Sequence, residues 1–161
     1  MHGWRYLTAV LDWSSRSILS WALSQTLELD FVLTAVDNAL LQATPEIWNS
    51  DPGAHFTSPR YLERLQNAKL QISMDGRGPA RDTIFTERLW RTLKDQEVYL
   101  HDYASPKEAY HQLANYIRFF NFERPHPALE VLTPAHLYGV QPHMVPVVHS
   151  APTLTNQSTF F

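Results

Sequence analysis

The sequence predicts an α/β fold with a mixed sheet, because short apolar runs typical of strands alternate with longer segments of helical periodicity. The predicted order is strand, strand, helix, strand, helix, strand, helix, helix. Of the 161 residues, 44% are hydrophobic and 18% are charged, which are the proportions of a chain that folds around a core. This length suits one domain of ordinary size rather than two.

Local signals place each element along the chain. Ser58 and Ser105 each precede a proline, a pattern typical of a helix start, and Asp30 is the predicted N-cap of an earlier helix. The predicted strands are 6–11, 16–21, 46–50 and 70–74, with a hairpin connection at 12–15; the predicted helices are 29–42, 59–69, 82–97 and 105–121. The segment 75–82 is a predicted flexible loop.

The composition excludes several classes of protein and site. Cysteine is absent, so disulfides, thiolate zinc sites and a cysteine nucleophile are excluded. The eight histidines are scattered along the chain, so we expect no zinc site. The longest apolar stretch, 29–43, contains Asp30 and Asp37, so no membrane span or membrane partner is expected. The N-terminal residues do not have the pattern of a signal peptide. We therefore expect a soluble, cytoplasmic protein.

The charge is distributed unevenly. The net charge is −3, yet residues 60–94 contain eight Lys or Arg against four Asp or Glu. A basic segment on an acidic chain favours a polyanion bound at one face, although a solvated helical surface explains the charge at least as well. From residue 141 onward the chain has scattered prolines and no periodicity, so we expect a folded core over 1–140 and a poorly ordered tail over 141–161.

Two carboxylates stand where a site would be expected. Asp51 follows a predicted strand at a turn, a common position for functional groups in α/β sheets. Glu87 lies on a predicted helix with Arg91 and Lys94 at i+4 and i+7, so the three share one face. This arrangement suits a metal ion that meets a phosphate backbone. An ordinary surface ion pair explains the helix alone better.

Four motifs, in order, resemble those of insertion-sequence transposases and retroviral-type integrase cores. They are YLTAVLDWSSRSILSW (6–21), WNSDPGAHFTS (48–58), RDTIFTERLWRTLKDQE (81–97) and NFERPHPALEVLTPAHLY (121–138). The 35 residues between Asp51 and Glu87 match the spacing of that family. His55, and Thr83 after Asp82, depart from its usual residues. Together the motifs are far more specific than any one of them.

The resemblance implies a ribonuclease-H-like mixed sheet flanked by helices and a metal-dependent transfer of DNA strands. Asp51 and Glu87 would be catalytic residues that bind Mg²⁺ or Mn²⁺, and Arg91 and Lys94 would bind DNA. The implied partners are DNA, as element ends and target, and either a second copy of the chain or an intact transposase. Such a protein would associate with the bacterial nucleoid.

The resemblance also predicts a gap in the site. The family's first catalytic Asp lies on a first, central strand that precedes the hairpin, and this chain has no such segment before Tyr6. Asp12 matches the hairpin turn, where it would accept backbone hydrogen bonds or pair with Arg16. We therefore expect a truncated core without its central strand, inactive as an isolated chain.

Other functions remain open at this point. The chain could be a non-catalytic fragment that binds DNA or modulates an intact transposase. It could be a ribonuclease-H-like nuclease that uses Asp12 with Asp51 and Glu87. A globular domain without nucleic-acid chemistry fits the four ordered motifs least well.

Overall fold

A five-stranded mixed sheet forms the centre of the molecule, with strand order β2-β1-β5-β3-β4. The computed structural model describes residues 6–51, 53–74, 81–98, 100–139 and 154–160. The strands are β1 (Tyr6–Asp12), β2 (Ile18–Ser24), β3 (Ile47–Ser50), β4 (Gln71–Met74) and β5 (Leu154–Phe160). Strand β1 is antiparallel to β2 and β5, whereas β3 is parallel to β4 and β5. The predicted mixed α/β sheet is confirmed.

Five helices accompany the sheet within the described part of the chain. They are α1 (Leu29–Gln42), α2 (Pro59–Asn67), α3 (Arg81–Leu93), α4 (Pro106–Phe122) and α5 (Pro134–Tyr138). A π-helical turn, η1 (Lys94–Val98), continues α3, and a 3₁₀ turn, η2 (Pro127–Leu129), follows α4. The sequence analysis missed α5 and η2, which are too short to show a periodicity. The predicted loop 75–82 lies mostly outside the described residues.

The structure tests the three N-caps that the sequence predicts. The hydroxyl of Ser58 accepts a hydrogen bond from the amide of Tyr61, and Ser105 accepts one from Glu108, so both predicted caps are confirmed. The predicted Asp30 cap is wrong. Helix α1 begins at Leu29, so its N-cap residue is Glu28, two residues before Asp30, and Glu28 makes no side-chain cap hydrogen bond. Asp30 lies in the first turn, where an acidic side chain favours the helix dipole.

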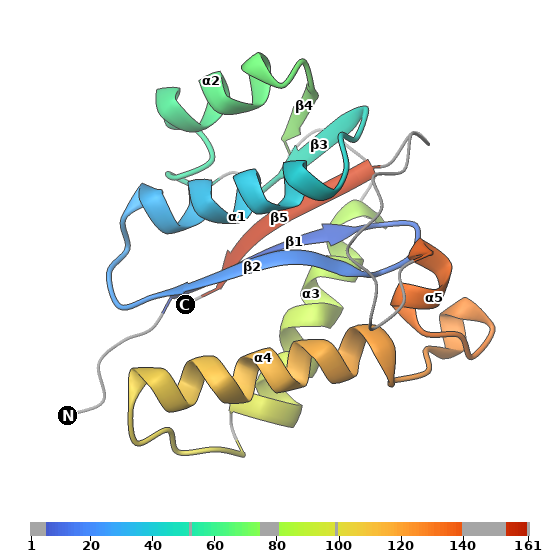
Figure 1. Ribbon diagram of the computed structural model, residues 1–161. Helices are drawn as coiled ribbons and strands as arrows, with labels where there is room; N and C mark the ends of the chain where they lie inside the picture. The colour runs from blue at the N-terminus through green and yellow to red at the C-terminus, as the bar shows by residue number, and fades with distance from the viewer. Residues whose placement is uncertain (1–5, 52, 75–80, 99, 140–153, 161) are drawn as a thin grey trace.

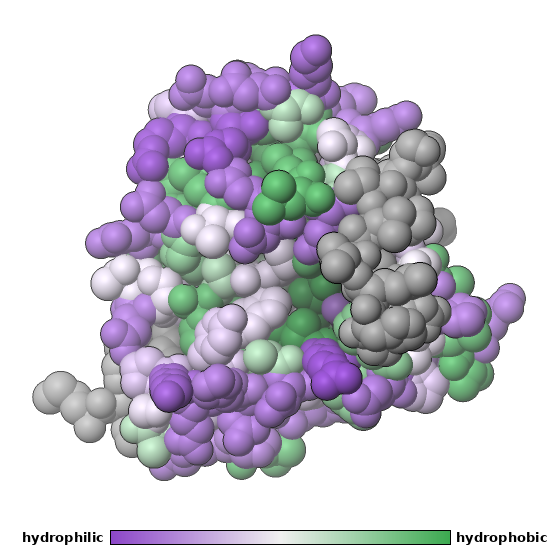
Figure 2. Space-filling view, in the orientation of Figure 1, coloured by the Kyte–Doolittle hydropathy of each residue, from purple (hydrophilic) through white to green (hydrophobic). Residues whose placement is uncertain are grey.

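Helices cover both faces of the sheet and enclose two separate apolar cores (Figure 1). The first core lies between the sheet and helices α1 and α2, where Val36, Trp48 and Leu65 are fully buried. The second lies between the other face of β1 and β2 and helices α3 and α4. Figure 2 shows hydrophilic side chains over α2 and α4 and apolar ones along the strip between them. The resulting layers are helix, sheet and helix.

The centre of the sheet is formed by the C-terminal strand. The sequence analysis expected a tail without order over 141–161 and a sheet without its central strand. In the structure, β5 lies between β1 and β3 and pairs with both, whereas residues 141–153 and 161 lie outside the described part. Strand pairing needs only free backbone N–H and C=O groups on the neighbouring strands, which hydrophobic periodicity does not reveal.

None of the helices in the described ranges is both long enough and apolar enough to span a bilayer.

Candidate functional site

Asp51 directly follows the carboxyl end of β3. A buried frame of three hydrogen-bonded side chains, Trp48, Ser50 and Tyr61, holds the end of this strand. The Tyr61 hydroxyl accepts a hydrogen bond from the Trp48 indole nitrogen at 2.9 Å and lies 2.7 Å from the hydroxyl of Ser50. Trp48, Ser50 and Tyr61 have no exposed surface, whereas Asp51 is half-buried. The frame therefore fixes the end of β3 and presents the next residue, Asp51, at the rim of the sheet.

Burial, hydrogen bonds and the charge of Asp51 together set the pKa of Tyr61. Burial raises the pKa of Tyr61 above its usual value, hydrogen bonds with Ser50 and Trp48 oppose the rise, and the negative charge of Asp51 adds to it. Tyr61 therefore stays neutral at physiological pH, and no proton is exchanged there. Its role is to position the strand end.

The turn after Asp51 is packed closely against the same tyrosine. The amide of Gly53 donates to the carbonyl of Asp51 at 2.8 Å, and Phe56 packs edge-on against Tyr61 with ring centroids 5.3 Å apart. A Cβ atom added at Gly53 would lie only 3.3 Å from the Phe56 ring. The short G-A-H-F turn is thus required for Phe56 to enter the core and hold the loop beside Asp51.

Helix α3 presents the second candidate carboxylate on its outer face. Glu87 and Arg91 are exposed, and Lys94 is half-buried at the first position of the π-helical turn. Buried Leu89 and Leu93 form the opposite, inner face. Helix α3 contacts β5, the strand next to β3, so Glu87 and Asp51 come from neighbouring parts of the fold.

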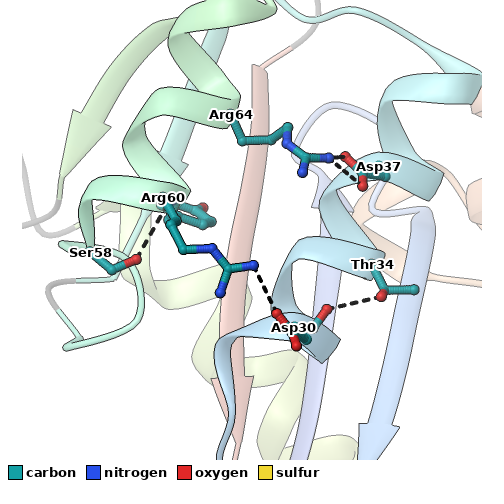
Figure 3. A network of polar contacts seen from close by, with 7 residues as sticks. Asp30, Thr34, Asp37, Ser58, Arg60 and Arg64 are labelled. Atoms are coloured by element: carbon teal, nitrogen blue, oxygen red, sulfur yellow. Dashed lines mark hydrogen bonds and ion pairs between the residues drawn. The ribbon is translucent and has the colours of Figure 1, made fainter.

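Two arginines of the basic segment, Arg60 and Arg64, form ion pairs between α2 and α1. Arg60 pairs with Asp30 at 3.0 Å, and Arg64 donates from one nitrogen to both carboxylate oxygens of Asp37 (Figure 3). These contacts join α2 to the acidic side of α1. Within the segment 60–94, these two arginines of α2 are therefore engaged in ion pairs with the protein itself. Arg88 and Arg91 of α3 are exposed.

Asp12 belongs to the hairpin turn, as the sequence analysis expected. Its Oδ2 atom accepts hydrogen bonds from the amide of Ser15 at 2.8 Å and from the Ser15 hydroxyl at 2.6 Å. The carboxylate is 2% exposed, and it also favours the charged form of nearby Arg16. This side chain stabilises a turn.

The strand register separates Asp12 from Asp51. Asp12 is opposite Thr155 of β5, which is opposite Trp48 of β3, three residues before Asp51. The two residues are therefore about 10 Å apart along the strands and about 10 Å apart across them. Carboxylates that share a metal ion bind it at about 2.0–2.6 Å, so this separation does not suit a shared ion.

The structure does not assemble three carboxylates around one point. Within the residues that it describes, no group of three His, Asp or Glu side chains is placed to hold a metal ion. Asp51 and Glu87 supply two carboxylates, and the central strand β5 has the sequence LTNQSTF, without an acid.

Sequence analysis missed Tyr61 and Asn121 as positioning residues. The Asn121 side chain accepts from the amide of Ile18 and donates to its carbonyl, both at 2.9 Å, which ties α4 to β2. Asn121 opens the quoted NFERPH motif, so the motif contained a signal, but its partner is 103 residues away. For Tyr61 the sequence offered only a position on an amphipathic helix.

The sequence of this chain is similar to those of known proteins of one family. Residues 68–134 match the family model described as the integrase core domain. InsK of insertion sequence element IS150 of Escherichia coli is 27% identical over 132 residues, which cover 80% of this chain and 47% of InsK. The transposase for insertion sequence element IS904 of Lactococcus lactis is 28% identical over 136 residues, which cover 82% of this chain and 54% of that protein. The chain is similar to the integrase-type cores of insertion-sequence transposases.

The integrase-type core also has solved structural neighbours. The HTLV-2 integrase catalytic core domain, solved in complex with magnesium, superposes with a TM-score of 0.64 at 18% identity and covers 82% of this chain and 84% of that one. This likeness confirms the ribonuclease-H-like fold that the motifs implied. The core spans about half the length of the transposases named above.

Proposed function

We propose that this core acts on DNA, in the integration and recombination of a mobile element by metal-dependent cleavage and transfer of phosphodiester bonds. The match of residues 68–134 to the integrase core domain is the observation on which the proposal rests. The placement of Asp51 at the rim of β3 by a buried frame gives it structural support, since functional groups of α/β sheets collect at the carboxyl ends of strands.

Asp51 and Glu87 are the proposed catalytic residues and metal ligands. Mg²⁺ or Mn²⁺ bound there would activate the attacking oxygen and stabilise the leaving one. The carboxylates of the described residues do not complete such a site, because no third acid joins these two. Asp51 is half-buried after β3, whereas Glu87 is on an exposed helix face.

Arg91 and Lys94 are the proposed DNA-binding residues. Arg91 follows Glu87 on α3 and Lys94 is the first residue of η1, where cations can meet non-bridging phosphate oxygens next to the carboxylate. The partners of the core would then be the element's DNA ends and its target, together with a second copy or an intact transposase. We propose the bacterial nucleoid as its location.

A second candidate function is non-catalytic. A fragment that binds DNA or associates with an intact transposase needs the folded core and the cations of α3 but no complete metal site. The incomplete carboxylate set among the described residues favours this alternative for the isolated chain.

A nicking assay separates the two functions. Supercoiled plasmid is incubated with the chain in Mg²⁺ or Mn²⁺, and binding to the same DNA is measured in chelator. Metal-dependent nicking that both Asp51→Asn and Glu87→Gln abolish supports the catalytic function. Binding that survives chelator and both substitutions, without nicking, supports the non-catalytic one. A folded chain that neither binds nor cleaves DNA would refute both.

A further inference from the structure

A pocket of about 300 Å³ lies away from Asp51, where three distant segments of the chain meet. One wall is the β1–β2 hairpin with Leu11 and Arg16, the second is α3, and the third is the end of α4 with the η2 turn. The size lies at the lower end of the range for small-ligand sites. None of the proposed catalytic or DNA-binding residues lines it.

The pocket is positively charged. Arg16, Arg88 and Arg124 line it, and its lining contains no carboxylate. Burial lowers the pKa of Arg16, and the charge of Arg88 lowers it further, although Asp12 behind it opposes both effects. Three guanidinium groups gathered around one space repel each other, so an anion in that space would be stabilised.

The arginines keep hydrogen-bonding capacity toward this space. Within the part of the chain that the structure describes, the side chain of Arg124 donates only through Nη1, to Gln96 at 2.8 Å and to the Tyr116 hydroxyl at 3.3 Å. Arg88 makes no hydrogen bond or ion pair with a described residue and is exposed. A planar guanidinium with free donors suits the oxygens of a phosphate.

His126 adds a polar atom without a partner. Its Nε2 atom is buried and makes no hydrogen bond with any residue that the structure describes. Burial and the charge of Arg124 lower the pKa of this histidine, so it is neutral at physiological pH and can accept or donate one hydrogen bond. An unpaired buried polar atom is costly, which favours a ligand that completes it.

Planar groups of Arg16, Phe85 and Phe120 form another part of the lining. The guanidinium of Arg16 lies over the ring of Phe85, with its carbon 3.1 Å from the ring centroid. Phe120 contacts His126 edge-on at 4.7 Å between ring centroids. Planar side chains of this kind are the surfaces on which nucleobases stack.

We propose that this pocket binds one unpaired nucleotide of a DNA strand, with its phosphate at Arg88 and Arg124 and its base against the wall of Phe85, Arg16 and Phe120. The proposal deepens the proposed action on DNA and rests on it. The nucleotide must be unpaired, because a base within a duplex stays stacked between its neighbours and cannot enter a pocket of this size. The pocket would hold a separated strand while α3 contacts the duplex.

The test compares two strands that differ only in their bases. Binding of a short fluorescent oligothymidylate and of an abasic strand of equal length is measured by anisotropy, in chelator and at fixed ionic strength. We expect the oligothymidylate to bind about tenfold more tightly. Phe85→Leu should remove this preference while the abasic strand still binds. Arg88→Gln should weaken both strands more than the matched control Arg118→Gln, an exposed arginine of α4 outside the pocket.

The outcomes distinguish a failure of the pocket assignment from a failure of the proposed action on DNA. If the wild-type chain binds both strands equally, and Arg88→Gln behaves like Arg118→Gln, the pocket assignment is overturned while DNA binding stands. Binding of neither strand, nor of duplex, by the folded chain would overturn the action on DNA as well. Displacement of the oligothymidylate by an equal concentration of thymidine monophosphate, but not by inorganic phosphate, would identify a free nucleotide as the ligand and overturn the assignment to a strand.

Discussion

The hydroxyl of Ser50 lies 2.7 Å from the hydroxyl of Tyr61, and this contact fixes the end of β3 one residue before Asp51. Trp48 donates to the same tyrosine oxygen, so two side chains on one face of the strand converge on one residue of α2. The position of the candidate carboxylate therefore depends on a buried contact between a strand and a helix.

Removal of the tyrosine hydroxyl should destabilise the protein. Tyr61→Phe leaves the Trp48 indole nitrogen and the Ser50 hydroxyl without this partner in a buried site, at a cost of about 1–3 kcal/mol in the free energy of unfolding. Urea unfolding measures the change. Tyr110→Phe is the matched control, because Tyr110 is 52% exposed and should change stability little. Equal stability of the two variants would contradict this role of Tyr61.

The same tyrosine predicts a loss of stability in alkali. The pKa of Tyr61 is raised in the folded state above its usual value of 10.0, so folding favours the protonated form. The stabilisation is fully present below pH 10 and is lost as the pH rises above that value, with a slope of up to about 1.4 kcal/mol per pH unit. Urea unfolding over this range should show the decline, which Tyr61→Phe should reduce. An identical decline in the variant would assign it to other groups.

Arginines of the basic segment should differ in their effect on DNA binding. Arg64→Gln removes a half-exposed ion pair with Asp37, so it should cost less than about 1 kcal/mol of stability and leave DNA affinity nearly unchanged. Arg91→Gln removes an exposed cation of α3 and should weaken DNA binding. The slope of log affinity against log salt concentration should become shallower by about one, because about one counterion fewer is released. Binding titrations at several salt concentrations test both. A larger loss for Arg64→Gln would restore α2 as a DNA-binding surface.

Asp12 should affect stability without affecting metal binding. Asp12→Asn weakens the hydrogen bonds that Ser15 donates to a charged acceptor, at a cost of about 1–2 kcal/mol. Mn²⁺ affinity, measured by electron paramagnetic resonance, should stay unchanged in this variant and fall in Asp51→Asn. A loss of Mn²⁺ affinity in Asp12→Asn with unaltered unfolding would instead make Asp12 a metal ligand.

The central strand should tolerate a change of side chain but not a loss of its backbone donor. Gln157 of β5 lies opposite Val10 on one side and Ser50 on the other. Gln157→Pro removes an N–H group from the middle of the sheet and should destabilise it by about 1–3 kcal/mol. Gln157→Thr keeps the N–H group and should fold normally. Urea unfolding of both variants decides whether β5 contributes to the stability of the sheet.

Local patterns in the sequence determined most of the elements of this protein. The apolar runs at 6–11 and 46–50 and the serine–proline pairs at Ser58 and Ser105 predicted strands and helix starts that the structure confirms. The turn role of Asp12 followed from the hairpin motif. These features depend on neighbours within a few residues, and capping and turn formation are local interactions.

Only the tertiary structure decided which distant residues meet. It placed the polar strand β5 between β1 and β3, although its sequence has no apolar alternation, because two strands offered backbone groups to pair. It matched Arg64 with Asp37, and it gathered Arg16, Arg88 and Arg124 around one pocket. Backbone pairing and charge proximity arise between segments far apart in the chain, so no local pattern reports them. The sequence by itself determined the elements and the class of the core, and long-range packing determined its central strand, its ion pairs between helices and its pocket.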